Sequence, residues 1–146
     1  MTTGITFDAE GVVLSWARSL PGLIGKGRPL VGVHLSEVRS PQMGAMATLR
    51  VSNADVDQDG LGHSAPITFE VRANGGQDGA RREAQQGARA LAVEVRKLTG
   101  QPVIVQTHEG SVKIRCAHTV QGPLFSGQIG GETAYRMSAV FVMQDV

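Results

Sequence analysis

The acidic run that begins at Asp55 is the stretch whose residue types and spacing come nearest to metal chemistry. Its opening matches that of a calcium-binding loop, in which oxygen ligands alternate along the chain and a glycine makes the turn. The matching residues are Asp55, Asp57, Asp59 and Gly60. The twelfth position of such a loop needs a bidentate glutamate, and here that position is Pro66. We therefore predict a solvated acidic hairpin loop that does not require calcium, and no metal ligands.

The histidines and the single cysteine form no catalytic or metal-binding pattern either. The imidazoles are scattered over three predicted strands and a loop, without the short spacings that zinc sites use. They belong to His34, His63, His108 and His118. Alternation over residues 111–119 places Cys116 on the same strand face as Ile114, which predicts a small buried side chain with no redox role. Glu70 and Glu83 are expected on solvated faces. We expect no catalytic residue, no cofactor and no enzymatic activity.

The composition indicates one folded domain over residues 1–146, with a core of aliphatic side chains. Hydrophobic residues make up 41% of the chain but aromatic residues only 4%, so Val, Leu, Ile and Ala must build the core. Fourteen basic and 13 acidic residues leave a net charge of +1, which favours neither a membrane nor sequence-specific nucleic acid as a partner. The single cysteine and the absence of a signal-peptide pattern suit a soluble protein of a reducing compartment.

Residues 78–99 predict the longest helix, around which the rest of the chain is organised. Apolar residues recur at steps of three and four along one face: Ala80, Ala84, Ala88, Leu91, Ala92, Val95 and Leu98. These small side chains allow a close approach to a sheet, while Gly87 costs about 1 kcal/mol of helix propensity that packing must offset. Four arginines of the opposite face are our candidates for an interface: Arg81, Arg82, Arg89 and Arg96. An ordinary solvated face remains the alternative.

The remaining elements complete an α+β pattern. A first helix is predicted over residues 7–20, with Trp16 as a packing anchor. Strands are predicted over residues 29–38, 48–52, 67–72, 102–108, 111–119 and 132–143. Glu109-Gly110 predicts a tight hairpin turn, residues 121–131 an irregular loop, and residues 39–47 a loop in which Met43 and Met46 offer adaptable contacts to a partner. The predicted fold is a single α+β domain, a mostly antiparallel sheet with two helices packed on it.

The chain resembles the tail terminator proteins of long-tailed bacteriophages, especially of phages that infect actinobacteria. One shared pattern is an N-terminal helix that ends at a proline turn and leads into a strand, here VVLSWARSLPG and then PLVGV. A second is a strand linked through glycines to an alanine-spaced helix, here ITFEVRA and EAQQGARALAVEVRKLTG. A third is Gly122-Pro123 before a tyrosine-bearing last strand, AYRMSAVFVMQ. The resemblance extends over nearly all 146 residues.

This resemblance implies a structural virion protein. Such proteins form a ring, usually of six copies, that caps the finished tail tube, ends its polymerisation and offers a docking surface to the head or neck. The implied partners are further copies of the chain, the tail tube protein and a head or neck connector protein. The implied location is the head-proximal end of the tail, after assembly in the host cytoplasm. A related neck or tail component, such as a stopper or tail tube protein, and a small non-viral α+β binding domain are the alternatives.

Overall fold

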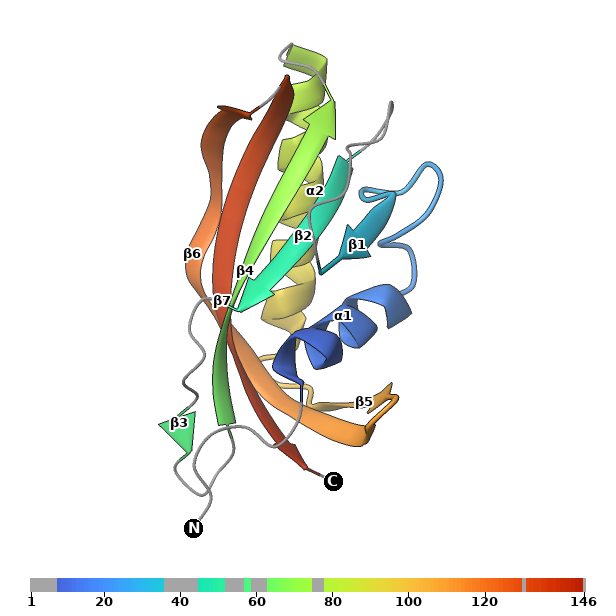
Figure 1. Ribbon diagram of the computed structural model, residues 1–146, viewed down its shortest axis with the longest axis vertical. Coiled ribbons are helices and arrows are strands. Elements are labelled where there is room, and N and C mark those ends of the chain that lie inside the picture. The colour runs from blue at the N-terminus through green and yellow to red at the C-terminus, as the bar shows by residue number, and fades with distance from the viewer. Residues whose placement is uncertain are drawn as a thin grey trace.

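The computed structural model describes residues 8–35, 45–51, 57–58, 63–74, 78–129 and 131–145, which form one sheet and two helices (Figure 1). The sheet has the strand order β1-β2-β4-β7-β6-β5, and β3 pairs with the start of β4. β1 is parallel to β2, and the other pairings are antiparallel. The strands are β1 (Gly32–His34), β2 (Ala45–Val51), β3 (Asp57–Gln58), β4 (His63–Asn74), β5 (Val103–Thr107), β6 (Gly110–Ile129) and β7 (Glu132–Asp145). The predicted α+β class with a mostly antiparallel sheet is confirmed.

The central pair of strands, β4 and β7, supplies one wall of the core. The two strands stay in register along the whole of β4, from His63 opposite Met143 to Asn74 opposite Glu132. Alternate side chains of both strands are buried on the same face, as period-two alternation requires: Ile67, Phe69, Val71, Tyr135, Met137, Ala139 and Phe141. The predicted alternation of both strands is confirmed.

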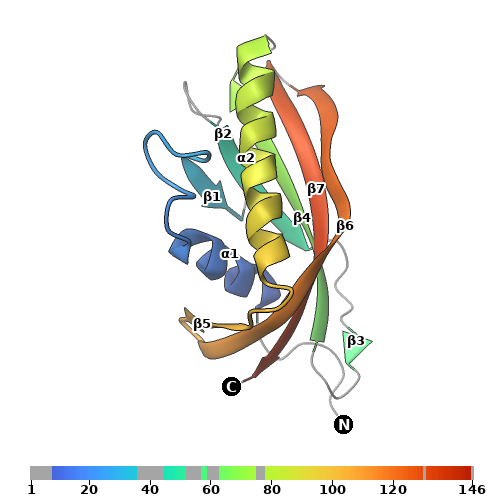
Figure 2. The ribbon, with the colours of Figure 1, turned by 180° about the vertical axis from the view of Figure 1, so that it is seen from behind.

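The helix α2 (Asp78–Lys97) lies along this face of the sheet, as Figure 2 shows. Its predicted apolar stripe is confirmed, because every residue of that stripe is buried. The closest approach is at Gly87, where an added Cβ would lie 2.8 Å from Leu30 Cδ2 and 3.0 Å from Val71 Cγ1. It would also lie 3.2 Å from the carbonyl oxygen of Pro29. Glycine therefore permits close packing that offsets its poor helix propensity.

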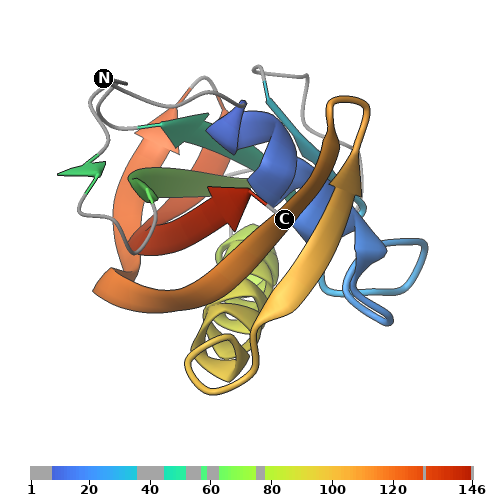
Figure 3. The same ribbon diagram turned by 90° about the horizontal axis from the view of Figure 1, so that it is seen from below.

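The second helix, α1 (Ala9–Ser19), closes one end of the core beside β5, as the view from below shows (Figure 3). Trp16 is 2% exposed, and its ring centroid lies 5.5 Å from that of Phe141 in an edge-to-face contact. The predicted role of Trp16 as a packing anchor is confirmed. Arg18 donates hydrogen bonds from Nε and Nη2 to the Val33 carbonyl oxygen, at 3.2 and 2.8 Å, and so ties α1 to β1. Neither described helix combines the length and the apolar character needed to cross a membrane.

The structure corrects the prediction of an irregular loop at residues 121–131, because β6 continues through it to Ile129. The pairing of β6 with β7 shifts register four times, between Ile114 and Cys116, Thr119 and Gln121, Gln121 and Leu124, and Phe125 and Gly127. Such bulges accommodate Gly122 and Pro123. Beyond Ile114, β6 has only β7 as a neighbour among the described strands, and proline is tolerated on an edge strand. Glycine and proline thus mark a bulged edge strand here, and the loop prediction is wrong.

Several strand boundaries also differ from the prediction. β4 runs from His63 to Asn74 rather than over residues 67–72, so it begins inside the predicted acidic loop. Of the strand predicted over residues 29–38, the structure describes residues 29–35, and within these only the three residues of β1 form a strand. β2 instead begins inside the predicted loop at residues 39–47, since Ala45 already pairs with Ala73 at the far end of β4. Met46 is therefore a strand residue, and its prediction as a loop residue is wrong.

The hairpin between β5 and β6 turns one residue earlier than predicted, at His108-Glu109. Thr107 pairs with Gly110 in the ladder, and its hydroxyl accepts a hydrogen bond from the Glu109 N–H at 3.1 Å. The same hydroxyl donates to the Gly110 carbonyl oxygen at 2.9 Å. Gly110, the first residue of β6, has a φ of 121°. This backbone conformation favours glycine.

Candidate interaction surface

The four candidate arginines lie on the exposed side of α2. This face is exposed, as the sequence predicts, at Arg81, Arg82, Arg89 and Arg96. The last turn adds Lys97, whose Nζ lies 3.1 Å from Glu94 Oε2. An ion pair this exposed contributes little stability. The part of the four arginines in an interface stays a prediction.

Arg81 also has a role inside the chain. Its Nε donates a hydrogen bond to the Tyr135 hydroxyl at 3.3 Å, and its guanidinium carbon lies 4.1 Å from the centroid of the Phe125 ring. The rings of Phe125 and Tyr135 meet edge to face at 5.7 Å. A guanidinium stacked on an aromatic face is attracted by the ring quadrupole. Arg81 thus ties α2 to β6 and β7, a contact between segments far apart in the sequence that periodicity alone could not reveal.

The other predicted contact residues are only partly covered by the structure. Met43 lies outside the described residues, and of Met46 only the backbone is described. Asp55 and Asp59 likewise lie outside, while Asp57 belongs to β3. Within the described ranges, no three or more His, Cys, Asp or Glu side chains gather into a potential metal site. The prediction of a calcium-independent loop stays a prediction.

Glu70 is buried, and its prediction as a solvated residue is wrong. It points to the sheet face opposite α2, yet its side chain is only 9% exposed. Arg72 lies 2.6 Å from Glu70 Oε1, and Arg136, its register partner on β7, lies 3.0 Å from Oε2. Two charge-assisted contacts, one from Arg72 on the same strand and one from Arg136 on β7, satisfy a carboxylate that the alternation alone would leave to water.

The same contacts control the ionisation of Glu70. Burial by itself raises the pKa of a carboxyl group, because it disfavours the charged form. The hydrogen bonds from Arg136 and Arg72, together with attraction to both guanidinium groups, outweigh burial and hold the pKa of Glu70 below its ordinary value. The group is structural, since both of its carboxylate oxygens are engaged by arginines.

Cys116 is half-buried, and its prediction as a core residue is wrong. The bulge between Ile114 and Cys116 reverses the alternation of β6, so that the next buried residue is Ala117, 1% exposed. His118, predicted on the same face as Cys116, is exposed. Simple period-two counting fails after a bulge, because the extra residue shifts every later side chain to the other face.

The sequence analysis missed an exposed apolar strip on β6. It consists of Val120, Leu124 and Phe125, whose exposed fractions are 66%, 55% and 39%. We call these three residues the β6 strip. The prediction of a loop at residues 121–131 concealed it, because exposed apolar residues on a sheet edge indicate a surface for another chain, whereas in a loop they do not. Leu124 and Phe125 extend from opposite faces of this edge, as their register partners Arg136 and Tyr135 do. The available signal was three large apolar side chains within a polar and glycine-rich run.

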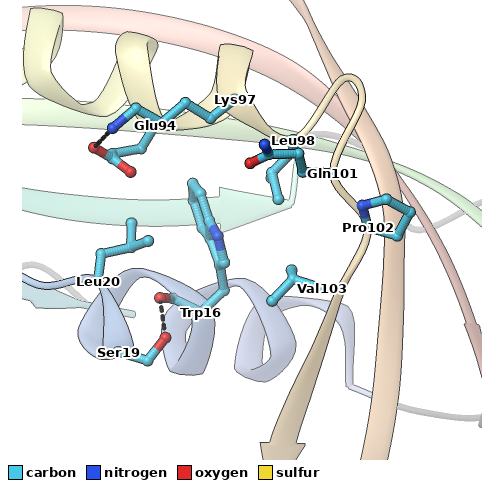
Figure 4. Close-up of a pocket in the computed structure, with 9 residues that line it drawn as sticks. All are labelled: Trp16, Ser19, Leu20, Glu94, Lys97, Leu98, Gln101, Pro102 and Val103. Carbon is cyan, nitrogen blue, oxygen red and sulfur yellow. Dashed lines mark hydrogen bonds and ion pairs between the residues drawn. The ribbon is translucent and has the colours of Figure 1, made fainter.

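A hollow lies between α1, the end of α2 and the start of β5 (Figure 4). Its volume is about 360 Å³, and apolar side chains form much of its lining: Trp16, Leu20, Leu98, Pro102 and Val103. Figure 4 shows the indole of Trp16 pointing from α1 toward α2, with the Glu94–Lys97 ion pair above it on α2. We call this the α1–α2 hollow. It is a partly open apolar surface with charge only on its rim.

The sequence was also compared with known proteins. It matches no model of a protein family, and no curated protein matches it.

Proposed function

We propose that this chain is a tail terminator protein, a structural subunit of a ring that caps the tail tube of a long-tailed phage. The ring, usually of six copies in the family that the chain resembles, ends tube polymerisation and presents a docking surface to the head or neck. Its partners are further copies of the chain, the tail tube protein and a connector protein. Its location is the head-proximal end of the tail.

The observation that carries the proposal is the exposed apolar edge of β6. From Cys116 to Ile129 this strand pairs on one side only, within the described part of the chain, and it bears the β6 strip. Exposed strand edges and apolar strips are unfavourable in a monomer and are expected where another chain covers them. A ring subunit needs such a surface to meet its neighbours.

The packing of the three segments that carry the resemblance also supports the proposal. The first segment covers most of α1, the second covers the later part of β4 and most of α2, and the third comprises Gly122-Pro123 of β6 and most of β7. Trp16 of α1 contacts Phe141 of β7, and Phe69 of β4 lies 6.3 Å from the same ring. The resemblance therefore concerns residues that build the body of the subunit, while the interfaces lie on its surface.

Labelling in the virion tests the proposal directly. In the phage that encodes this chain, a tagged copy should label only the head-proximal end of the tail. The number of copies per particle should equal the number of subunits in one ring. Loss of the chain should give tails of uncontrolled length that do not join heads. Label along the whole tube would identify a tail tube protein instead, and particles without label would refute a virion role.

A further inference from the structure

We propose that the β6 strip of one copy packs into the α1–α2 hollow of the next copy, and that this contact forms the seam between ring subunits. The inference rests on the proposed function only in that the contact closes a ring; the contact between two copies does not depend on it. The two surfaces belong to the same chain and can be tested in the free protein.

Most of the β6 strip is exposed in the described part of the chain. Val120 and Leu124 are each more than half exposed, whereas Phe125 is partly covered by Arg81. Burying such side chains removes apolar area from water, which is the main driving force for protein association. Contact with an apolar partner surface would therefore be favourable, because it would remove the apolar area of Val120 and Leu124 from water.

The α1–α2 hollow has the size and lining that the strip requires. An apolar cavity of about 150 Å³ accepts a molecule of the size of benzene, so a hollow of about 360 Å³ can accept branched side chains such as those of Val120 and Leu124. Trp16 and Leu98 form its apolar floor, and both are almost fully buried. A side chain that enters the hollow would pack against side chains already held in place.

The charges around the two surfaces are complementary. Arg136, the register partner of Leu124, keeps its Nη2 on Glu70 at 3.0 Å, yet its side chain is 51% exposed, so the rest of its guanidinium lies at the surface beside the strip. The rim of the hollow carries Glu94, whose present partner is the largely exposed Lys97. An exposed ion pair of this kind contributes little stability. Glu94 can therefore exchange Lys97 for an arginine of a neighbouring copy at little cost in stability.

The placement of the two surfaces favours a second copy of the chain as the occupant. The C-terminal half of β6 runs along one side of the molecule, whereas α1 and β5 lie on the other side in both views (Figures 1 and 2). A strip and a complementary hollow on different sides of one molecule give a head-to-tail contact, and repetition of that contact closes a ring when the rotation allows it.

Disulfide cross-linking tests the seam. In a Cys116→Ser background, which removes the single native cysteine, Leu124→Cys is combined with Leu20→Cys. Mild oxidation of the concentrated free protein, and of tails carrying the variant, should give a ladder of covalent oligomers. The matched control combines Leu124→Cys with Val93→Cys, an exposed α2 residue that does not line the hollow, and should give no ladder. Dimers from Leu124→Cys alone would show an edge-to-edge contact and overturn the head-to-tail seam.

A substitution series separates the seam from the proposed function. Val120→Ser with Leu124→Ser should weaken self-association at least tenfold in sedimentation measurements, while Ile104→Ser, equally exposed on β5, should leave it unchanged. A chain that labels tail ends but gives no ladder, free or in tails, would refute the seam and keep the terminator assignment. A ladder from a chain that is absent from tails would support the seam and refute the terminator assignment.

Discussion

Glu70 is the residue whose environment sets a measurable pH dependence. Its pKa is held below the ordinary value by Arg136 and Arg72 despite burial, so the folded state prefers the charged carboxylate more strongly than the unfolded chain does. The resulting stabilisation is fully present above the unfolded pKa of about 4.5. It is lost as the pH falls through the lower folded pKa, because the protonated group no longer attracts the arginines.

We expect Glu70→Gln to lower the free energy of unfolding at pH 7 by about 2 kcal/mol, the order of a hydrogen bond to a charged group. The difference from the wild type should shrink below pH 4. Urea denaturation at both pH values measures it. Glu83→Gln, at an exposed position on α2, is the control and should change the unfolding free energy by less than about 0.5 kcal/mol. A difference that is the same at both pH values would contradict this account of Glu70.

Gly87 is the second residue with a sharp expected effect. Gly87→Ala improves helix propensity by about 1 kcal/mol, but the added methyl group meets Leu30, Val71 and the rigid backbone oxygen of Pro29. Overpacking of this kind costs about 1 to 3 kcal/mol, so we expect a lower Tm. Gly79→Ala is the matched control, because a Cβ there has no atom within 4 Å, and it should keep or raise Tm. A rise in Tm for both variants would mean that α2 can move away from the sheet.

These residues show what could be predicted from the sequence. The buried stripe of α2 follows from local periodicity, which a single helix reveals by itself. The burial of Glu70 depends on Arg136, 66 residues later in the chain, and the need for Gly87 depends on Leu30 and Pro29. Contacts of that kind come from the sheet order, which no local pattern encodes.

At the scale of elements, β6 marks the limit of prediction from the sequence. Helix α2 and strands β4 and β7 were predicted correctly because their patterns are regular. β6 carries four register shifts, so its side chains follow no single period, and Gly122-Pro123 favoured a loop. The exposed strip lies in this irregular part, and the surface that carries the proposals was therefore the least predictable one.

The contact between Arg81 and Phe125 links α2 to this edge and can be measured by a double-mutant cycle. Arg81→Met and Phe125→Leu keep much of the side-chain volume while each removes one partner of the stacked pair. We expect a coupling energy of about 0.5 to 1 kcal/mol in urea denaturation, the range for exposed cation–π pairs. The control cycle uses Arg89→Met with Phe125→Leu and should give no coupling. Zero coupling in both cycles would show that the stacking does not stabilise α2 on β6.

At the scale of the whole molecule, the proposed seam uses the two lateral sides and leaves the arginine face of α2 uncovered. This face, and the sheet face opposite α2 on which no described helix packs, are then the surfaces on which a ring could meet the tail tube or the neck. Because the net charge of the chain is only +1, the cluster on α2 is a local feature. Repulsion between identical copies therefore does not oppose ring closure strongly.

Charge reversal on α2 tests whether this face binds a partner. Arg82→Glu with Arg89→Glu should leave the subunit folded by circular dichroism, since both residues are exposed, and should reduce incorporation into tails at least tenfold. The loss should be greatest at low salt, where exposed charges are least screened. Lys26→Glu with Arg28→Glu makes the same change in net charge on an exposed loop outside the arginine face of α2, and should leave incorporation unchanged. Equal incorporation of both variants would show that the arginine face is only solvated, whereas equal loss would trace the effect to total charge.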